Sequence, residues 1–285
     1  MKINPKKILL GTANFKTKYG FKSTFINKKK SIEILNYALK KNISGIDIST
    51  NYMITNDLKK INQKKFPFIS LKFTERKLKK INSKNDLMLF LKPFLSLSKK
   101  QKIDCILFHR AKDLFTKRGV TIYKILRHLK KNKKISKIGV SIYDLKEIKK
   151  ILKKYKIDVL QIPFNVLDQR LLNSNFLGLL KRRKIEIHAR SIFLQGLTLN
   201  ENLAPTKLKK SKDLKKWFFY LKDNKFDPLS ENLNFINRHK FIKKIIVGVR
   251  SKDHLNKILK KNIIVKKNYD KFNSLNLKLI DPRKW

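Results

Sequence analysis

The sequence has one cysteine, few glycines and few acidic residues. Cys105 stands alone, so the chain cannot form an intramolecular disulfide, which fits a reducing compartment. Because Cys105 lies in an apolar run, we expect a buried thiol rather than a nucleophile. No G-x-G-x-x-G pattern occurs, which argues against a Rossmann domain.

Long apolar runs are also missing. No stretch of about 18 uncharged apolar residues occurs, so we expect no membrane-spanning helix. The apolar run near the start is too short for the core of a signal peptide. The five histidines lack the short spacing of a metal site, so no metal is expected. These absences together predict a cytoplasmic protein.

Acidic residues are scarce: 20 Asp and Glu stand against 71 Lys and Arg, a formal net charge of +51. One interpretation is a polyanionic partner, either nucleic acid or an anionic membrane. The other is a compositional bias toward lysine. We favour the bias, because the charge is spread over the whole chain instead of forming one patch. We therefore expect no membrane or nucleic-acid partner, and keep polyanion binding as a third hypothesis.

The chain alternates short apolar runs with longer amphipathic segments. The apolar runs are rich in β-branched residues, which is typical of strands buried on both faces. They predict strands at 8–13, 45–49, 67–72, 104–109, 137–141, 159–163, 185–191 and 244–249. Apolar residues at helical spacing predict helices at 31–41, 84–97, 119–131, 144–154, 171–181, within 208–238 and at 251–259. A polar segment to about Gln63 follows the second strand and completes the eighth unit. Ser31 is expected to cap the first of these helices.

Eight strand–helix units in strict alternation predict a parallel sheet with crossover helices. Eight is the number that closes a barrel, so the predicted class is an α/β protein with a (β/α)8 TIM barrel fold. No linker or repeat divides the chain, and residues 1–285 are expected to form a single domain. Residues 195–211 are read as an irregular loop at the barrel mouth. Residues 281–285 form a tail that either folds over the mouth or is disordered.

Polar side chains gather where three successive predicted strands end. Asp47 belongs to the second strand and Tyr52 follows it, whereas Lys72 and His109 end the third and fourth strands. Each of them alone has an ordinary structural explanation. The carboxyl ends of barrel strands, however, are where active sites form, so the set of four is the candidate catalytic group.

These residues resemble those of the aldo/keto reductase superfamily, and the likeness extends over nearly the whole chain. It rests on segments 10–15, 45–49 with Tyr52, 70–72, 107–109, 138–141, 160–165, 193–196 and 247–251. The opening and the Phe193 to Gly196 segment look like bacterial members associated with surface-polysaccharide synthesis. The resemblance implies an NAD(P)H-dependent oxidoreductase that reduces a small aldehyde or ketone to an alcohol.

The resemblance also implies roles for the four residues. Tyr52 would act as the general acid that protonates the carbonyl oxygen. The Lys72 ammonium would lower the phenol pKa from its ordinary value of about 10, and Asp47 would hold Lys72 in place. His109 would hydrogen-bond the carbonyl oxygen and orient the substrate.

A further set of positions is assigned to the cofactor by the same resemblance. Ser141 and Gln161 match residues that bind the nicotinamide carboxamide, and residues 248–251 match the segment near the adenosine phosphates. The complete set is Gly11, Thr12, Ser141, Gln161, Arg190, Ser191, Gly248, Arg250 and His254. NADPH is the expected cofactor, because Arg250 could pair with its 2′-phosphate. NADH stays possible, because His254 stands where many NADP-dependent members carry an arginine.

Three positions depart from the family pattern. Ile142 replaces an asparagine, Met53 replaces a glycine, and Asn56 replaces a glutamate. In addition, Arg190 stands where a tyrosine often packs against the nicotinamide. These departures leave a second hypothesis open, namely a nicotinamide-binding barrel with a regulatory role and little turnover. The substrate and the oligomeric state are not readable from the sequence.

Overall fold

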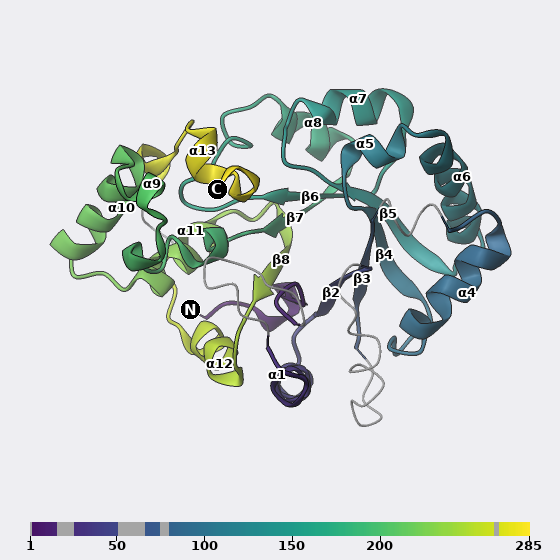
Figure 1. Ribbon diagram of the computed structural model, residues 1–285, viewed down its shortest axis with the longest axis horizontal. Helices are drawn as coiled ribbons and strands as arrows, with labels where there is room; N and C mark the ends of the chain where they lie inside the picture. Colours follow the sequence, from purple (N-terminus) through teal and green to yellow (C-terminus); the bar gives the residue numbers. More distant parts are fainter. Residues whose placement is uncertain (1, 16–25, 51–65, 75–79, 265–267) are drawn as a thin grey trace.

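The computed structural model describes residues 2–15, 26–50, 66–74, 80–264 and 268–285. Within them lie eight strands: β1 Ile8–Gly11, β2 Gly45–Ser49, β3 Ile69–Phe73, β4 Ile103–Phe108, β5 Ile135–Ser141, β6 Val159–Pro163, β7 Glu186–Arg190 and β8 Ile242–Gly248. All neighbouring pairs are parallel, and β1 pairs with both β2 and β8, so the sheet closes (Figure 1). The predicted (β/α)8 TIM barrel is confirmed.

Helices follow the strands and surround the barrel (Figure 1). Those in the described residues are α1 Lys28–Lys40, α4 Lys84–Leu95, α5 Ala111–Leu114, α6 Lys117–Lys131, α7 Glu147–Lys154, α8 Phe176–Arg182, α9 Thr206–Lys209, α10 Lys212–Asp223, α11 Pro228–Arg238, α12 Lys252–Lys260 and α13 Leu277–Ile280. Short 3-10 turns are η1 Pro5–Lys7, η2 Leu194–Gly196, η3 Glu201–Leu203, η4 Asp270–Phe272 and η5 Pro282–Lys284. The longer helices bury an apolar stripe, such as Ile122, Leu126 and Leu129 of α6.

Most strand residues are buried on both faces, although β8 has exposed positions. Every residue of β2 and of β4 is buried, as the continuous apolar runs predicted. Cys105, in β4, is a free and fully buried thiol, as expected, and burial raises its pKa. Gly45 is required where β2 passes β3, because a Cβ there would lie 1.9 Å from the Phe68 carbonyl oxygen.

The start of α1 differs from the prediction. Ser31 does not cap this helix: α1 begins at Lys28, and the side chain of Asn27 accepts the Lys30 amide at 2.9 Å. The Ser31 hydroxyl instead donates to the Asn27 carbonyl oxygen, 3.0 Å away. Lysine is a good helix former, so the helix extends one turn before its first apolar position.

The segment after β7 is also more ordered than predicted. Residues 195–211 include parts of η2, all of η3 and α9, so they are not a single irregular loop. Of the two alternatives for the tail, the structure has the folded one, because residues 282–284 form η5. Both segments lie near the barrel mouth, where they contact residues of the site.

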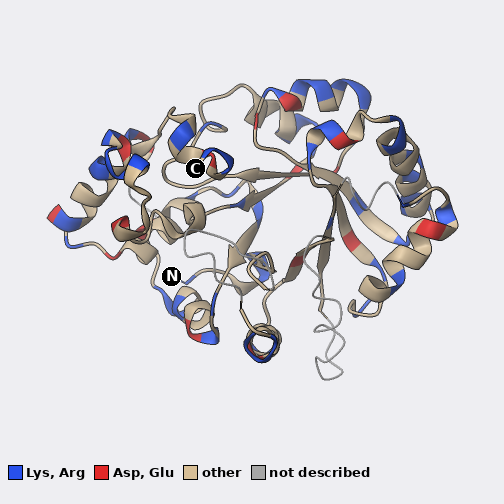
Figure 2. Ribbon diagram, viewed as in Figure 1, with Lys and Arg blue, Asp and Glu red and all other residues tan. Residues whose placement is uncertain are grey.

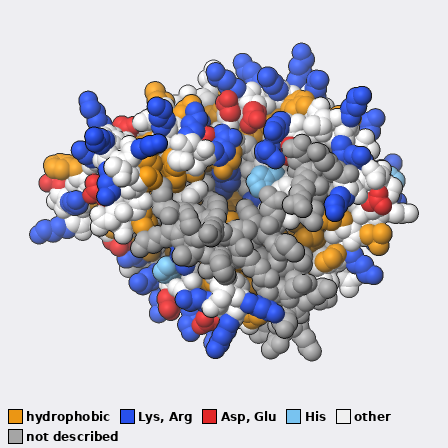
Figure 3. All heavy atoms as spheres, viewed as in Figure 1, with side chains coloured by type: hydrophobic (Ala, Val, Ile, Leu, Met, Phe, Trp, Pro, Cys, Tyr) orange, Lys and Arg blue, Asp and Glu red, His pale blue; other side chains and the backbone are white. Residues whose placement is uncertain are grey.

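Lysine and arginine are distributed over all the outer helices (Figures 2 and 3). Neither view gathers them into one basic patch, which agrees with the uniform spread along the sequence. In the part of the chain that the structure describes, no helix combines the length and the apolar character needed to cross a membrane.

Candidate active site

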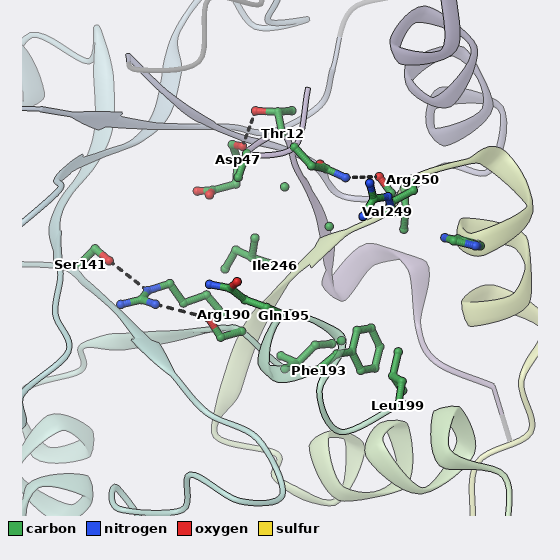
Figure 4. Close-up of a pocket in the computed structure, with 18 of the residues that line it drawn as sticks. Thr12, Asp47, Ser141, Arg190, Phe193, Gln195, Leu199, Ile246, Val249 and Arg250 are labelled. Carbon is green, nitrogen blue, oxygen red and sulfur yellow. Dashed lines mark hydrogen bonds between the residues drawn. The ribbon is translucent and has the colours of Figure 1, made fainter. Parts of the chain in front are cut away.

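A cavity of about 520 Å³ opens at the carboxyl ends of the barrel strands (Figure 4). Its wall is built from the ends of β1, β7 and β8 and from the segment that follows β7. The residues that line it and matter below are Thr12, Asp47, Lys72, His109, Ser141, Tyr143, Arg190, Ser191, Phe193, Gln195, Gly248, Arg250 and His254. Such a pocket is large enough for a substantial organic ligand.

Polar residues reach the barrel interior because side chains alternate along a strand. Asp47 and Ser49 are two positions apart on β2, and Ser70 and Lys72 are two apart on β3. The register pairs Asp47 with Ser70 and Ser49 with Lys72, so the four side chains belong to adjacent layers of the interior. The strand pairing therefore brings the acid and the amine together.

The Asp47 carboxylate accepts three hydrogen bonds. Lys72 Nζ donates to Oδ2 at 2.5 Å, while Ser70 Oγ and Gln161 Nε2 donate to Oδ1 at 2.8 and 3.1 Å. Lys72 Nζ also donates to Oε1 of Gln161, 3.0 Å away. Because Asp47 and Lys72 are both buried, this network fixes the ammonium in one position at the cavity wall.

His109 follows β4 and lines the same cavity. Its backbone amide donates to the Phe73 carbonyl oxygen at 2.9 Å, and its Nδ1 lies 3.3 Å from Ser49 Oγ. Burial, and then the charges of Lys72 and Arg190, lower the pKa of His109 to about 3. The imidazole is therefore neutral at physiological pH and able to donate one hydrogen bond.

The structure brings most of the predicted site residues to this one cavity. The catalytic candidates Asp47, Lys72 and His109 line it, together with the cofactor candidates Gly11, Thr12, Ser141, Arg190, Ser191, Gly248, Arg250 and His254. Gln161 is fully buried and its amide is bonded to Lys72 and Asp47. Tyr52 lies outside the described residues, as do Met53 and Asn56.

The wall after β7 has an unusual backbone. Ser191, Leu194 and Gln195 adopt φ values of 53°, 44° and 57°, and Gly196 follows with φ 96°. Non-glycine residues rarely occupy this region, and such strain concentrates at ligand sites. Asn165 Nδ2 donates to the Ser191 carbonyl oxygen at 3.1 Å and so supports the first of these turns.

Arg190 points from the end of β7 toward Ser141 (Figure 4). Its guanidinium carbon lies 3.8 Å from the centroid of the Tyr143 ring. The guanidinium of Arg283 stacks on the same ring, also at 3.8 Å, and the carboxylate of Asp281 accepts hydrogen bonds from Arg283. The folded tail is thereby attached to a residue that lines the cavity.

Several contributors to the site were not predicted from the sequence. Ser49 contacts His109, and Tyr143 carries the two guanidiniums. A signal existed for Ser49, because it lies two residues after Asp47 and so faces the same side of β2. The stack on Tyr143 had no such signal, since Arg283 is distant in sequence and approaches only through the folded tail.

The described side chains do not form a metal site. Among residues 2–15, 26–50, 66–74, 80–264 and 268–285, no group of three or more His, Cys, Asp or Glu side chains is placed to hold a metal ion. The chemistry of the cavity as described comes from an ion pair, a neutral imidazole and further cationic and hydroxyl groups.

The fold is shared with several solved structures. Aldo-keto reductase AKR11C1 from Bacillus halodurans is 15% identical, with a TM-score of 0.70, and the match covers 98% of this chain and 95% of that one. Glycerol dehydrogenase AKR11B4 from Gluconobacter oxydans is 14% identical, with a TM-score of 0.66 and coverage of 97% and 92%. A variant of Gox0644 in complex with NADPH is 16% identical, with a TM-score of 0.62 and coverage of 90% and 84%.

Sequence comparison gives a complementary result. No curated protein sequence matches this chain. The model of the Aldo/keto reductase family, in contrast, matches residues 7–277, which is nearly the whole length. Together with the closed barrel and the cavity at its carboxyl end, this match establishes that the chain belongs to the aldo/keto reductase family.

Proposed function

We propose that this enzyme reduces an aldehyde or ketone to an alcohol with hydride from NADPH, and that Tyr52 is the general acid. The observation that carries the proposal is the buried Asp47–Lys72 pair beside the neutral His109, at the wall of one cavity. The pair offers a fixed positive charge next to the place where an oxyanion would develop. The imidazole offers a hydrogen-bond donor there.

The residues of the cavity suit a nicotinamide dinucleotide. A Cβ at Gly248 would meet no atom within 4 Å, so the glycine leaves open space beside the end of β8. Arg250 and His254 lie next to the first turn of α12, where Ser251 accepts the His254 amide at 3.2 Å. A helix N-terminus with an adjacent arginine suits a phosphate, and these residues would hold the phosphate end.

Ser141, Ser191 and Thr12 provide hydroxyl groups elsewhere on the wall for the remainder of the cofactor. A bound nicotinamide supplies the hydride that forms the new C–H bond at the carbonyl carbon and is itself oxidised by two electrons. As the C=O π bond breaks, its electron pair moves to the oxygen. The protein must then deliver one proton to that oxygen.

Tyr52 is the residue to which we assign this proton. The Lys72 ammonium would lower the pKa of the phenol, because a nearby positive charge favours the phenolate. Asp47, Ser70 and Gln161 would act through Lys72, since their hydrogen bonds determine where its ammonium lies. The phenolate formed after transfer would recover its proton from solvent.

His109 would orient the substrate. If Nδ1 accepts the Ser49 hydroxyl proton, the neutral imidazole carries its own proton on Nε2. Nε2 would then donate to the carbonyl oxygen and hold it toward Tyr52. A neutral donor stabilises the oxyanion and does not compete with Tyr52 for the role of acid.

The preference for NADPH is part of the same proposal. A variant of Gox0644, one of the similar structures, is in complex with NADPH, and Arg250 offers a charge for a 2′-phosphate in this chain. A small carbonyl compound as substrate and a cytoplasmic location stay predictions. A link to surface polysaccharides likewise rests on the sequence resemblance alone.

A second candidate function is a barrel that binds nicotinamide with little turnover. Arg190 favours it, because a guanidinium at the end of β7 would disfavour a positively charged oxidised nicotinamide lying against it. The reductase proposal is stronger, since the Asp47–Lys72 pair would have no role in a protein that only binds the cofactor.

The distinguishing experiment uses Tyr52→Phe in the full-length protein. We expect NADPH binding, followed by nicotinamide fluorescence, to stay within about twofold of wild type, while carbonyl reduction falls by at least about 100-fold. Tyr37→Phe is the matched control, because Tyr37 lies on α1 and its hydroxyl donates to Asn256. Full activity of Tyr52→Phe would refute the assignment, and binding without turnover in wild type would favour the second candidate.

A further inference from the structure

Arg190 is a buried cation whose contacts with the described residues are all neutral. Only 9% of the residue is exposed. Nη2 donates to the Ile142 carbonyl oxygen at 2.9 Å, and Nε and Nη1 donate to the hydroxyls of Ser141 and Ser191 at 3.3 and 3.4 Å. The remaining face stacks on Tyr143. None of these partners neutralises the positive charge.

Buried cations are ordinarily paired with a carboxylate, because an unpaired charge is costly to remove from water. In the described residues, no carboxylate lies within ion-pair distance of Arg190. Asp168 is buried, which raises its pKa, and its two oxygens accept from Arg170 Nε and Nη2, each at 2.8 Å, so its carboxylate is paired with Arg170 instead of Arg190. The counter-charge for Arg190 is therefore not supplied by the described parts of the chain.

The abundance of lysine does not explain this charge. The excess of lysine and arginine is carried by the outer helices, where water solvates the charges (Figure 2). Arg190 belongs to the barrel interior, between the side chains of Ser141 and Ser191. A guanidinium has five N–H groups, and the hydrogen bonds above use three, so two have no partner among the described residues and can serve a ligand.

Its position points to the substrate end of the cavity. Arg190 and His109 line the same cavity, and the charge of Arg190 contributes to the lowered pKa of His109. Arg250, which suits the cofactor phosphates, lies on the opposite side of the cavity (Figure 4). Arg190 and Arg250 would therefore contact different parts of the ligands that occupy the cavity.

We propose that the carbonyl substrate carries a carboxylate close to the reacting carbonyl, as in a 2-oxo acid, and that Arg190 binds this carboxylate. The inference rests on the proposed carbonyl reductase function. The two free N–H groups and the positive charge suit a carboxylate, and Tyr143 with Arg283 holds the guanidinium in place. The carboxylate does not change in the reaction: carbon gains hydride, oxygen gains a proton, and the product is a hydroxy acid.

The experiment compares phenylglyoxylate with its methyl ester, which have the same ketone but differ in charge. We expect wild type to reduce the acid with a higher kcat/KM than the ester. Arg190→Gln should lower kcat/KM for the acid about 10- to 100-fold, as expected for loss of a charged hydrogen-bonding partner. Activity of the same variant on the ester should fall by a clearly smaller factor, so that the acid-to-ester ratio of kcat/KM decreases, and measurable ester reduction shows that the variant is folded.

Two further variants sharpen the result. Arg190→Lys keeps the charge without the planar group and should retain an intermediate preference for the acid. Arg110→Gln is the matched control, because Arg110 is adjacent to His109 in sequence but its side chain is half-exposed and pairs with Asp113. Its acid-to-ester ratio should equal that of wild type.

Four outcomes overturn the inference. Equal loss of activity on acid and ester in Arg190→Gln would make Arg190 a structural residue. A weaker NADPH affinity in that variant, with an unchanged acid-to-ester ratio, would assign Arg190 to the cofactor. Reduction of the ester but not the acid by wild type would exclude a carboxylate on the substrate and leave the reductase function intact. If wild type reduced neither compound, nor any neutral aldehyde, both proposals would be refuted.

Discussion

The Lys72 ammonium lies 2.5 Å from the Asp47 carboxylate at the wall of the cavity, and both side chains are buried. A buried pair of this kind contributes little net stability, but removing one partner leaves the other charge uncompensated. Its value to the enzyme is the fixed position of the ammonium. Because the pair is buried, replacing one partner should measurably change the free energy of unfolding.

Asp47→Asn should lower the free energy of unfolding by about 3–5 kcal/mol, because Lys72 would keep its charge and lose its carboxylate. Urea denaturation of wild type and variant measures the difference. Glu33→Gln is the control, since Glu33 pairs with Lys252 at 2.8 Å on an exposed surface and its loss should have no measurable effect. Equal stability of Asp47→Asn and wild type would show that the buried pair is not formed in solution.

Ser49→Ala should reduce kcat for carbonyl reduction about 3- to 10-fold and leave NADPH affinity unchanged. The hydroxyl lies 3.3 Å from His109 Nδ1, and its loss removes the partner that places the imidazole proton on Nε2. Nitrogen chemical shifts of the imidazole would report a mixture of tautomers in the variant. Ser49→Thr should restore both the shift and the rate; unchanged shifts in Ser49→Ala would exclude this positioning role.

The lowered pKa of His109 predicts how stability depends on pH. In the unfolded chain the imidazole titrates near 6.5, whereas in the folded protein the pKa is about 3. Between these values the unfolded state binds more protons, so the contribution of His109 makes the protein less stable as the pH falls from 6.5 toward 3. Unfolding of His109→Gln should therefore depend less steeply on pH in this window. If the free energies of unfolding of wild type and variant depended equally on pH, the lowered pKa of His109 would be contradicted.

Arg250→Gln should raise the Kd for NADPH about tenfold and change the Kd for NADH by less than about twofold, because only NADPH carries the 2′-phosphate. Burial, Lys257 and Arg250 lower the pKa of His254, so binding of a phosphate there should be accompanied by proton uptake. Lys252→Gln, on the same helix, is a control for the loss of one exposed charge. An equal loss of affinity for both nucleotides would remove the basis for an NADPH preference.

Most of the strands were predictable because their side chains are buried on both faces, as in β2 and β4. The runs at 45–49 and 159–163 agree with β2 and β6 residue for residue, and the other strands were found with shifted ends. The strand ends are less predictable, because a run of buried residues does not show where the strand pairing stops. For example, β3 extends to Phe73, one residue beyond Lys72. The cap of α1 was predicted wrongly because the helix begins before its first apolar residue. The lysines at 28–30 have a high helix propensity, so the helix starts after Asn27.

Much of the candidate site was also predictable, because a barrel places the ends of successive strands on one rim. Asp47, Lys72 and His109 line the same cavity for that reason. The sequence could not reveal that Gln161 bonds to both Asp47 and Lys72, because those contacts cross the barrel interior between distant strands. The sequence also could not reveal that Arg190 is buried with no carboxylate partner among the described residues. Its surroundings depend on how the folded tail packs against the end of β7.

The most direct test of nicotinamide-dependent carbonyl reduction is a single-turnover measurement. The full-length protein, saturated with NADPH, is mixed with benzaldehyde and, separately, with phenylglyoxylate, and the nicotinamide absorbance is followed. Loss of that absorbance with at least one of the two in wild type, and its persistence in Tyr52→Phe, is the predicted result. Persistence in wild type with both compounds, despite saturable NADPH binding, would contradict the reductase function and favour a nicotinamide-binding role.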